Sequence, residues 1–211
     1  MTFLVVGCQN ESEEIRLINQ AERLFDAYPD SVITTLDSIP LPEEMSPRLI
    51  ARWCMLYARA ADKIEDEMPY TNQLEIALKY YQKKKMREEE AEIGLYLGRS
   101  YVEDKEYEKA MRTYSDALKV ALAIKDYNRA GYICSYMGDL YEVDLRYILA
   151  AEKYKESGKY FHLANNTTSY VRAFVNEGRS YMSVDSNYLA LASLKQAEVI
   201  MDSLNVENVK T

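Results

Sequence analysis

Three short stretches recur at an even spacing in this 211-residue chain: LGRSY at Leu97–Tyr101, GDLY at Gly138–Tyr141 and EGRSY at Glu177–Tyr181. Forty residues separate each glycine from the next, and a tyrosine follows each one three residues later. The whole chain holds only seven glycines. Because an isolated glycine costs about 1 kcal/mol inside a helix, three in register indicate a structural requirement.

The same forty-residue register places similar residues in further columns. We expect each glycine on a first helix to face an alanine twelve residues later on a second helix, so that the two helices approach closely. The tyrosine then fills the space beside them. The motif is therefore interpreted as packing rather than as a phosphate-binding loop. The further columns are Ala110/Ala150/Ala190, Tyr114/Tyr154/Leu194 and Ala117/Ser157/Ala197.

This pattern resembles the tetratricopeptide repeat (TPR), in which L-G-x2-Y is followed by A-x3-F. The resemblance covers repeats at residues 87–126, 127–166 and 167–205, with a divergent pair at 46–86, and so spans residues 46–211. It implies an all-α fold, namely a right-handed α-α superhelix of about ten helices in antiparallel pairs. HEAT and armadillo repeats share the period, but they do not require the Gly, Tyr and Ala columns.

The rest of the chain also has helical composition. No proline follows Pro69, and strand-like alternation is absent. Earlier helices are expected over 13–27, 31–39 and 48–63. Residues 9–45 are interpreted as a tether followed by a short helix pair.

Polar residues mark the turns between these helices. Asp104 and Asp144 lie between the first and second helix of a repeat, and we expect each to be the N-cap of the second helix. Asp126–Asn128 and Asn165–Thr168 lie between repeats and are predicted to supply turn and cap residues in the same way.

The charge of the chain excludes some partners. A net charge of −8 and a pI near 4.9 argue against nucleic-acid binding, which needs clustered Lys and Arg. A membrane contact through a basic patch is disfavoured for the same reason. The sequence contains no run of about 18 apolar residues, so no transmembrane helix is predicted.

The first eight residues, MTFLVVGC, resemble the end of a bacterial lipoprotein signal. Leu4–Cys8 matches the lipobox, in which Cys8 receives the lipid after cleavage and Gln9–Glu14 becomes a polar tether. The resemblance implies membrane anchoring through lipid in the bacterial cell envelope, on its periplasmic or surface face. The alternative is an apolar tail with an ordinary cysteine, and a cytoplasmic location.

The TPR resemblance implies a protein or peptide ligand on the face lined by the first helix of each pair. Arg172, Asn176 and Arg179 share one helical face, and with Arg99 they could bind a carboxylate. The competing interpretation is a solvated face with ion pairs within a helix, because TPR domains that clamp a peptide C-terminus have a denser basic set. The predicted groove residues are Arg99, Tyr132, Tyr136, Asp139, Arg172, Asn176 and Arg179.

No catalytic residue, metal site or cofactor is predicted. His162 is the only histidine and has no Cys or Ser placed beside it by helical spacing. Cys54 and Cys134 share the apolar phase of their helices, where a buried, unreactive thiol is the ordinary case. The protein is therefore not expected to be an enzyme.

The sequence thus favours a non-enzymatic TPR scaffold, anchored to a bacterial membrane as a lipoprotein, that binds a protein or peptide. The alternative is the sensory or regulatory TPR region of a larger signalling or transcription-regulating protein. A homodimer through the C-terminal helix is a further expectation, and its apolar residues are Leu189, Leu191, Leu194, Val199 and Met201.

Overall fold

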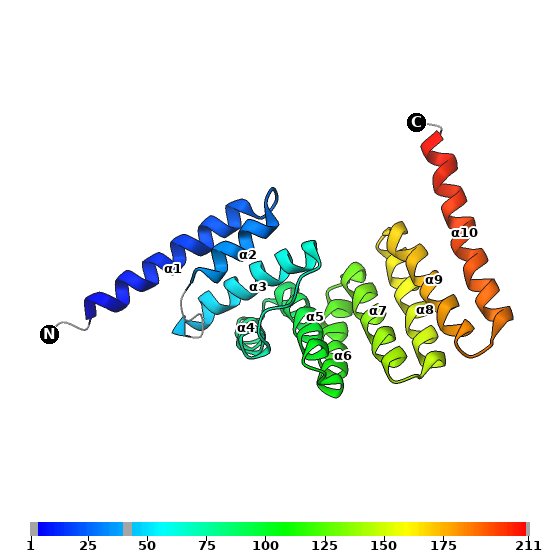
Figure 1. The fold of residues 1–211 in the computed structure, drawn as a ribbon, viewed down its shortest axis with the longest axis horizontal. Helices are drawn as coiled ribbons and strands as arrows, with labels where there is room; N and C mark the ends of the chain where they lie inside the picture. The colour runs from blue at the N-terminus through cyan, green and yellow to red at the C-terminus, as the bar shows by residue number, and fades with distance from the viewer. Residues whose placement is uncertain (1–3, 40–43, 210–211) are drawn as a thin grey trace. The chain divides into compact units, whose positions relative to one another are not determined.

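The computed structural model describes the backbone of residues 4–39 and 44–209 and the side chains of residues 13–39 and 44–202. Within these ranges every regular element is an α-helix, and successive helices form antiparallel hairpins (Figure 1). The all-α solenoid prediction is therefore confirmed. The ten helices described are α1 (Leu4–Leu24), α2 (Pro29–Asp37), α3 (Pro47–Ile64), α4 (Thr71–Lys84), α5 (Arg87–Glu103), α6 (Tyr107–Ala123), α7 (Tyr127–Val143), α8 (Tyr147–Leu163), α9 (Thr167–Met182) and α10 (Asn187–Val209).

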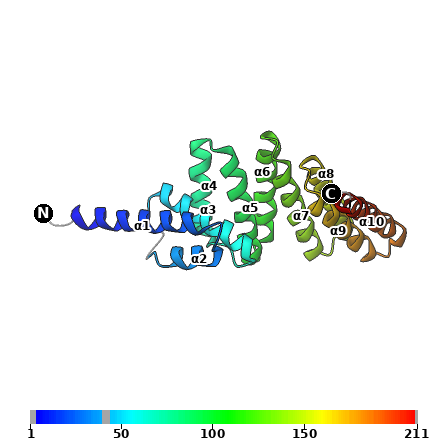
Figure 2. The same cartoon turned by 90° about the horizontal axis from the view of Figure 1, so that it is seen from above.

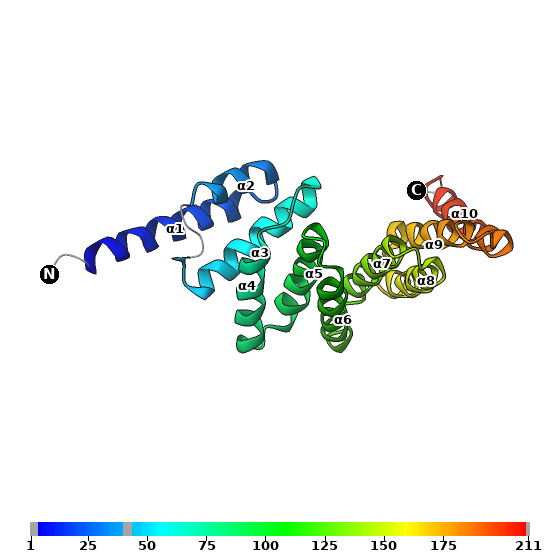
Figure 3. The same cartoon turned by 60° about the horizontal axis from the view of Figure 1, so that its bottom comes forward.

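The chain divides into two compact units, and the boundary falls after Ala110, inside α6. In the first unit α3 is central and contacts α1, α2, α4 and α5 (Figure 3). In the second unit α8 lies between α7 and α9, and α10 packs against α9 (Figure 2). Helix pairs thus bury their apolar faces against neighbours within each unit.

Every turn from α3 onward has the same backbone geometry. One residue in each turn has a positive φ, between 55° and 62°, and consecutive ones are 20 residues apart. The backbone N–H of the next residue donates to the carbonyl five positions earlier, which defines a Schellman motif. The seven residues are Glu65, Lys85, Lys105, Lys125, Leu145, Asn165 and Asp185.

The recurring tyrosine has a fixed position in this turn. The carbonyls that close the motif after the first helix of each repeat belong to Tyr101, Tyr141 and Tyr181, at N···O distances of 2.8, 2.8 and 3.0 Å. The backbone N–H of Arg146 donates to the Tyr141 carbonyl, and the guanidinium of Arg146 lies 5.2 Å from the centre of the same tyrosine ring. The tyrosine is thus at a fixed place relative to the end of its helix.

The predicted N-caps are correct between repeats and wrong within them. Asp126 and Asn166 cap α7 and α9, because their side chains accept the backbone N–H three residues later at 2.9 and 3.1 Å. Asp104 and Asp144 instead follow the last residues of α5 and α7 as C-caps. The positive-φ residue comes directly after each, so the next helix begins too late for an aspartate there to cap it.

At Gly138 and Gly178 the closest side-chain atoms belong to the residue sixteen positions later, not to the alanine twelve positions later. A Cβ added to Gly138 would lie 2.7 Å from Cε1 of Tyr154, a side chain with no solvent exposure. The atoms nearest to this glycine therefore belong to the tyrosine column rather than to Ala150. At Gly178 an added Cβ would lie 3.0 Å from Cγ of Leu194, which takes the place of the tyrosine in that repeat.

Candidate functional site

The arginine in both copies of GRSY binds a carboxylate on the preceding first helix. Arg99 of α5 pairs with Asp62 of α3, and Arg179 of α9 pairs with Glu142 of α7 at 3.0 Å. Each partner lies 37 residues earlier in the chain. Ser180 Oγ donates to the same Glu142 carboxylate at 2.6 Å. These ion pairs run between helices rather than within one helix, so the motif joins one repeat to the previous one.

Similar pairs join the earlier helices of the first unit. Arg52 of α3 donates to Glu22 of α1 at 2.7 Å. Arg59 of α3 binds Glu92 of α5 with two hydrogen bonds, of 2.6 and 2.7 Å, and the pKa of Arg59 is raised chiefly by this contact. Bidentate contacts of this kind fix the geometry of the pair as well as its charge. They hold α1, α3 and α5 in register.

The two groove tyrosines of α7 are held by other side chains of the second unit. The ring of Tyr132 meets Phe161 edge-on, with 4.9 Å between centroids, and its hydroxyl lies 3.3 Å from Ser169 Oγ. The ring of Tyr136 is stacked on Tyr114 with 6.0 Å between centroids. Both tyrosines therefore contribute to packing, and Tyr132 also remains at the surface.

The remaining predicted groove residues differ in how they are held. Asp139 lies at the surface, and its carboxylate accepts a hydrogen bond from Tyr154 at 2.5 Å. Arg172 is exposed and Asn176 is half-buried on α9. Arg99 belongs to the first unit, whereas the other six belong to the second.

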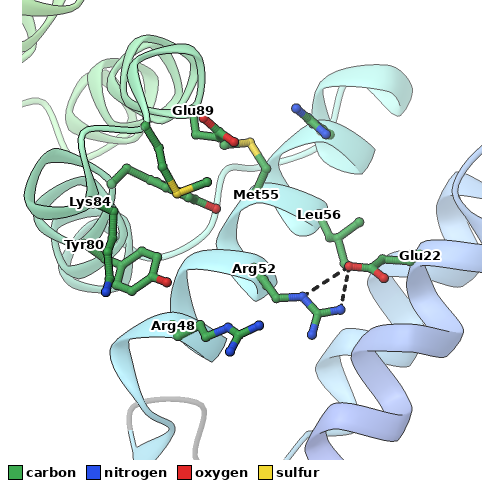
Figure 4. Close-up of a pocket in the computed structure, with 11 residues that line it drawn as sticks. Glu22, Arg48, Arg52, Met55, Leu56, Tyr80, Lys84 and Glu89 are labelled. Carbon is green, nitrogen blue, oxygen red and sulfur yellow. Dashed lines mark hydrogen bonds and ion pairs between the residues drawn. The ribbon is translucent and has the colours of Figure 1, made fainter.

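A basic pocket lies in the first unit, where α1, α3, α4 and the start of α5 meet. It has a volume of about 520 Å³. Figure 4 shows Arg48 and Arg52 of α3 between Tyr80 and Lys84 of α4 on one side and Glu22 of α1 on the other. The full lining is Glu22, Arg48, Arg52, Met55, Leu56, Arg59, Tyr80, Tyr81, Lys84, Met86 and Glu89.

Among the described residues, carboxylates pair with only two of the four cations that line this pocket. Arg52 and Arg59 bind carboxylates of α1 and α5, as described above. Arg48 and Lys84 have no ion-pair partner among the described residues, and the Lys84 ammonium lies 6.0 Å from the centre of the Tyr80 ring. The pocket therefore offers positive charge beside apolar surface, in a chain whose net charge is −8.

Reasoning from the sequence missed this pocket. The repeat pattern is weakest over residues 46–86, so all the predicted groove residues lie in the three clear repeats that follow. A usable signal was present, because Arg48, Arg52 and Arg59 are spaced by four and seven residues and so share one face of a helix. Their meeting with Lys84 depends on how α3 and α4 pack.

Comparison with known proteins identifies the fold. No family model matches the chain, and no curated protein sequence matches it. Solved structures do match, among them RapI in its apo form, with a TM-score of 0.72, 12% identity and coverage of 94% of this chain and 73% of that one. A putative kinesin light chain of nearly identical TPR-like repeats from Podosopora anserina matches with a TM-score of 0.67 and 13% identity, over 92% of this chain and 97% of that one. BtubC from P. vanneervenii matches with a TM-score of 0.62 and 17% identity, over 93% of this chain and 91% of that one.

The chain has a TPR-like fold. The resemblance drawn from the Gly, Tyr and Ala columns is thereby confirmed. At these identities the likeness concerns the fold alone. In TPR terms α3, α5, α7 and α9 are first helices and α4, α6, α8 and α10 are second helices. The basic pocket thus lies at the pair α3–α4, and GRSY lies on two first helices.

Within this TPR-like fold the cysteines whose side chains are described lie in the core. Cys54 and Cys134 are free thiols with no solvent exposure, and burial raises the pKa of both, that of Cys134 to about 12. The prediction of buried thiols is confirmed for these two. Cys8 falls within the backbone range of α1, but its side chain lies outside the described residues.

The described residues contain no group of three His, Cys, Asp or Glu side chains placed to hold a metal ion. Among the same residues no helix is both long and apolar enough to span a membrane. On α10 the apolar side chains proposed for a dimer are exposed, from 37% for Leu194 to 68% for Val199. The dimer itself stays a prediction.

Proposed function

We propose that this protein is a non-enzymatic scaffold whose first unit binds an acidic segment of a partner protein or peptide. The observation that carries the proposal is the basic pocket, in which Arg48 and Lys84 have no carboxylate partner among the described residues. An Asp or Glu side chain, or a terminal carboxylate, would supply the missing charge.

The apolar part of the pocket favours a peptide over an inorganic anion. Met55, Leu56, Tyr80 and Met86 line the same space as the cations. A pocket of about 520 Å³ falls in the usual range for a small ligand or a few side chains. An acidic residue next to an apolar one would therefore use both parts of the lining.

The experiment measures fluorescence anisotropy with a labelled, C-terminally amidated peptide built from Asp, Leu and Ser. A second peptide carries Asn in place of every Asp. We expect the acidic peptide to bind and the neutral one to bind at least about tenfold more weakly, because charge-assisted hydrogen bonds are lost. In the double variant Arg48→Glu/Lys84→Glu, the affinity for the acidic peptide should fall by about tenfold or more.

A control variant with the same change of net charge is available on α4. Lys79→Glu/Lys83→Glu alters exposed residues that do not line the pocket, and it should keep the affinity within about twofold. Equal binding of the acidic and neutral peptides would contradict the proposal. So would equal affinities in the pocket variant and its control.

We further propose that Cys8 carries a lipid that tethers the scaffold to the bacterial envelope, with a cytoplasmic location as the alternative. The support is the lipobox-like run Leu4–Cys8 and the polar segment that follows it. Intact-mass analysis and detergent partition of the natively expressed protein should show a diacyl or triacyl increment, and Cys8→Ser should abolish it. A native protein without lipid would rule out the tether.

A further inference from the structure

A second pocket of the first unit has the opposite character from the basic one. It has a volume of about 630 Å³ and lies where the end of α2, the middle of α3 and the start of α4 meet. The loop between α3 and α4 completes it. Its lining consists of Asp37, Ile39, Trp53, Tyr57, Glu67, Met68, Pro69, Tyr70, Asn72 and Gln73.

Aromatic rings form one side of this pocket. Trp53 and Tyr57 lie one helical turn apart on α3, with 5.0 Å between ring centroids and planes inclined by 39°. The indole N–H of Trp53 donates to the Leu36 carbonyl at 3.2 Å, which fixes the ring. Tyr70 is 77% exposed at the rim. Trp53 itself is only 3% exposed, so Tyr57 and Tyr70 are the rings that a ligand can reach. Such rings attract cations through the ring quadrupole.

The charged groups that line the pocket are both anions. Asp37 and Glu67 are carboxylates, and no Lys, Arg or His is among the lining residues. Burial, with the negative charges of Asp37 and then Asp66, raises the pKa of Tyr57 to about 12. Burial and the charge of Asp66 also raise the pKa of Asp37. The potential in this pocket is therefore negative.

Among the described residues, one acceptor in the lining has no hydrogen-bond partner. Gln73 is only 4% exposed, and its Oε1 accepts no hydrogen bond among the described residues. A buried acceptor without a donor is costly, and native proteins leave few of them. Because this oxygen has almost no accessible surface, a ligand could reach it only if the Gln73 side chain turned toward the pocket.

We propose that this pocket binds an organic cation that carries N–H donors, of the guanidinium or primary ammonium type. The cation would lie against Tyr57 and Tyr70, with Asp37 and Glu67 providing the counter-charge. A guanidinium or primary ammonium can donate N–H hydrogen bonds to these carboxylates, whereas a quaternary ammonium has no N–H to donate. The site is separate from the basic pocket and adds a second ligand class to the proposed scaffold.

Trp53 is the only tryptophan of the chain, so intrinsic fluorescence reports on this pocket directly. The titrants are agmatine, acetyl-Gly-Arg-Gly-amide and the same peptide with citrulline, a neutral isostere of arginine. The ionic strength is about 0.15 M, so that non-specific attraction of the cationic probes to the negatively charged protein is screened. We expect a saturable fluorescence change with at least one of the two guanidinium compounds and none with citrulline.

The two guanidinium probes separate the sources of such a cation. If agmatine binds saturably and displaces the peptide, the site is assigned to a free small cation. Saturation by the peptide alone would assign it to a basic side chain of a partner. Either result supports the shared chemistry.

Neutral isosteres test the residues. Asp37→Asn/Glu67→Gln should weaken binding by about tenfold or more, because charge-assisted contacts are lost. Asp30→Asn removes an exposed carboxylate at the other end of α2 and should leave the affinity within about twofold. No saturable change with either guanidinium compound, or equal binding of citrulline, would overturn the proposal. The same holds if the double variant binds as tightly as Asp30→Asn.

Discussion

Replacing Gly138 with alanine is expected to lower the free energy of unfolding by about 1–3 kcal/mol. The new Cβ would lie 2.7–3.0 Å from three ring atoms of Tyr154. That ring is fully buried, and its hydroxyl is held by Asp139, so it has little freedom to move away. The strain therefore exceeds the gain in helix propensity from removing a glycine. Urea unfolding followed by far-UV circular dichroism measures the difference.

The same replacement at Gly158 is the matched control, and its expected effect has the opposite sign. A Cβ there would meet Ala173 Cβ at 3.5 Å and Tyr170 at 3.6 Å, which are ordinary van der Waals contacts. Gly158→Ala should thus raise the free energy of unfolding by about 0.5–1 kcal/mol. Both glycines lie in the second unit, so the same cooperative unit reports on both. Equal effects of the two variants would contradict the packing role of Gly138.

The second large effect is expected at Glu177, a carboxylate in an otherwise apolar column. Its counterparts in the other repeats, Leu97 and Met137, are buried, and Glu177 itself is only 4% exposed. Burial raises its pKa, while Lys155 and then a hydrogen bond from Ser193 act in the opposite direction. Ionised Glu177 therefore reduces the stability of the fold.

Glu177→Met should raise the free energy of unfolding by about 1–3 kcal/mol near pH 7. The folded-state pKa lies above the unfolded value, so the wild-type protein loses stability as the pH rises through these two values. Below the unfolded pKa the carboxyl is protonated in both states, and this ionisation penalty disappears. The advantage of Glu177→Met is thus expected to shrink as the pH falls towards about 4.

Urea unfolding across this pH range measures the effect, and Glu152→Met on α8 is the control. Glu152 is exposed, so its replacement should change the stability by less than about 0.5 kcal/mol at every pH. If Glu177→Met is less stable than the wild type at about pH 7, the ionised carboxylate stabilises the repeat and the prediction is wrong.

The columns of the sequence predicted the helix pairs well, because the spacing of glycine, tyrosine and alanine follows from local helical geometry. They predicted partners poorly. Gly138 lies against Tyr154 rather than Ala150, and Arg99 and Arg179 pair with carboxylates on the preceding first helix. These contacts depend on the register between helices, which a periodic pattern in one helix does not specify.

The turns illustrate the same division. A residue with a positive φ recurs every twenty residues, which is half the repeat length. The sequence does not reveal this spacing, because none of the seven residues is a glycine. The turn is closed by backbone hydrogen bonds that any residue can make, so side-chain identity carries little signal there. The capping residues Asp126 and Asn166 act through their own side chains and were predictable.

By itself the sequence determined the all-α class, the forty-residue repeat and the TPR-like fold, because these follow from short-range spacing and from the residues that close packing tolerates. The tertiary structure alone decided where charge collects. The basic pocket joins side chains of α1, α3, α4 and α5, and the acidic aromatic pocket joins α2, α3 and α4. Residues so far apart in the chain meet only because helix pairs stack, and the stacking sets which charges are neutralised and which remain for a ligand.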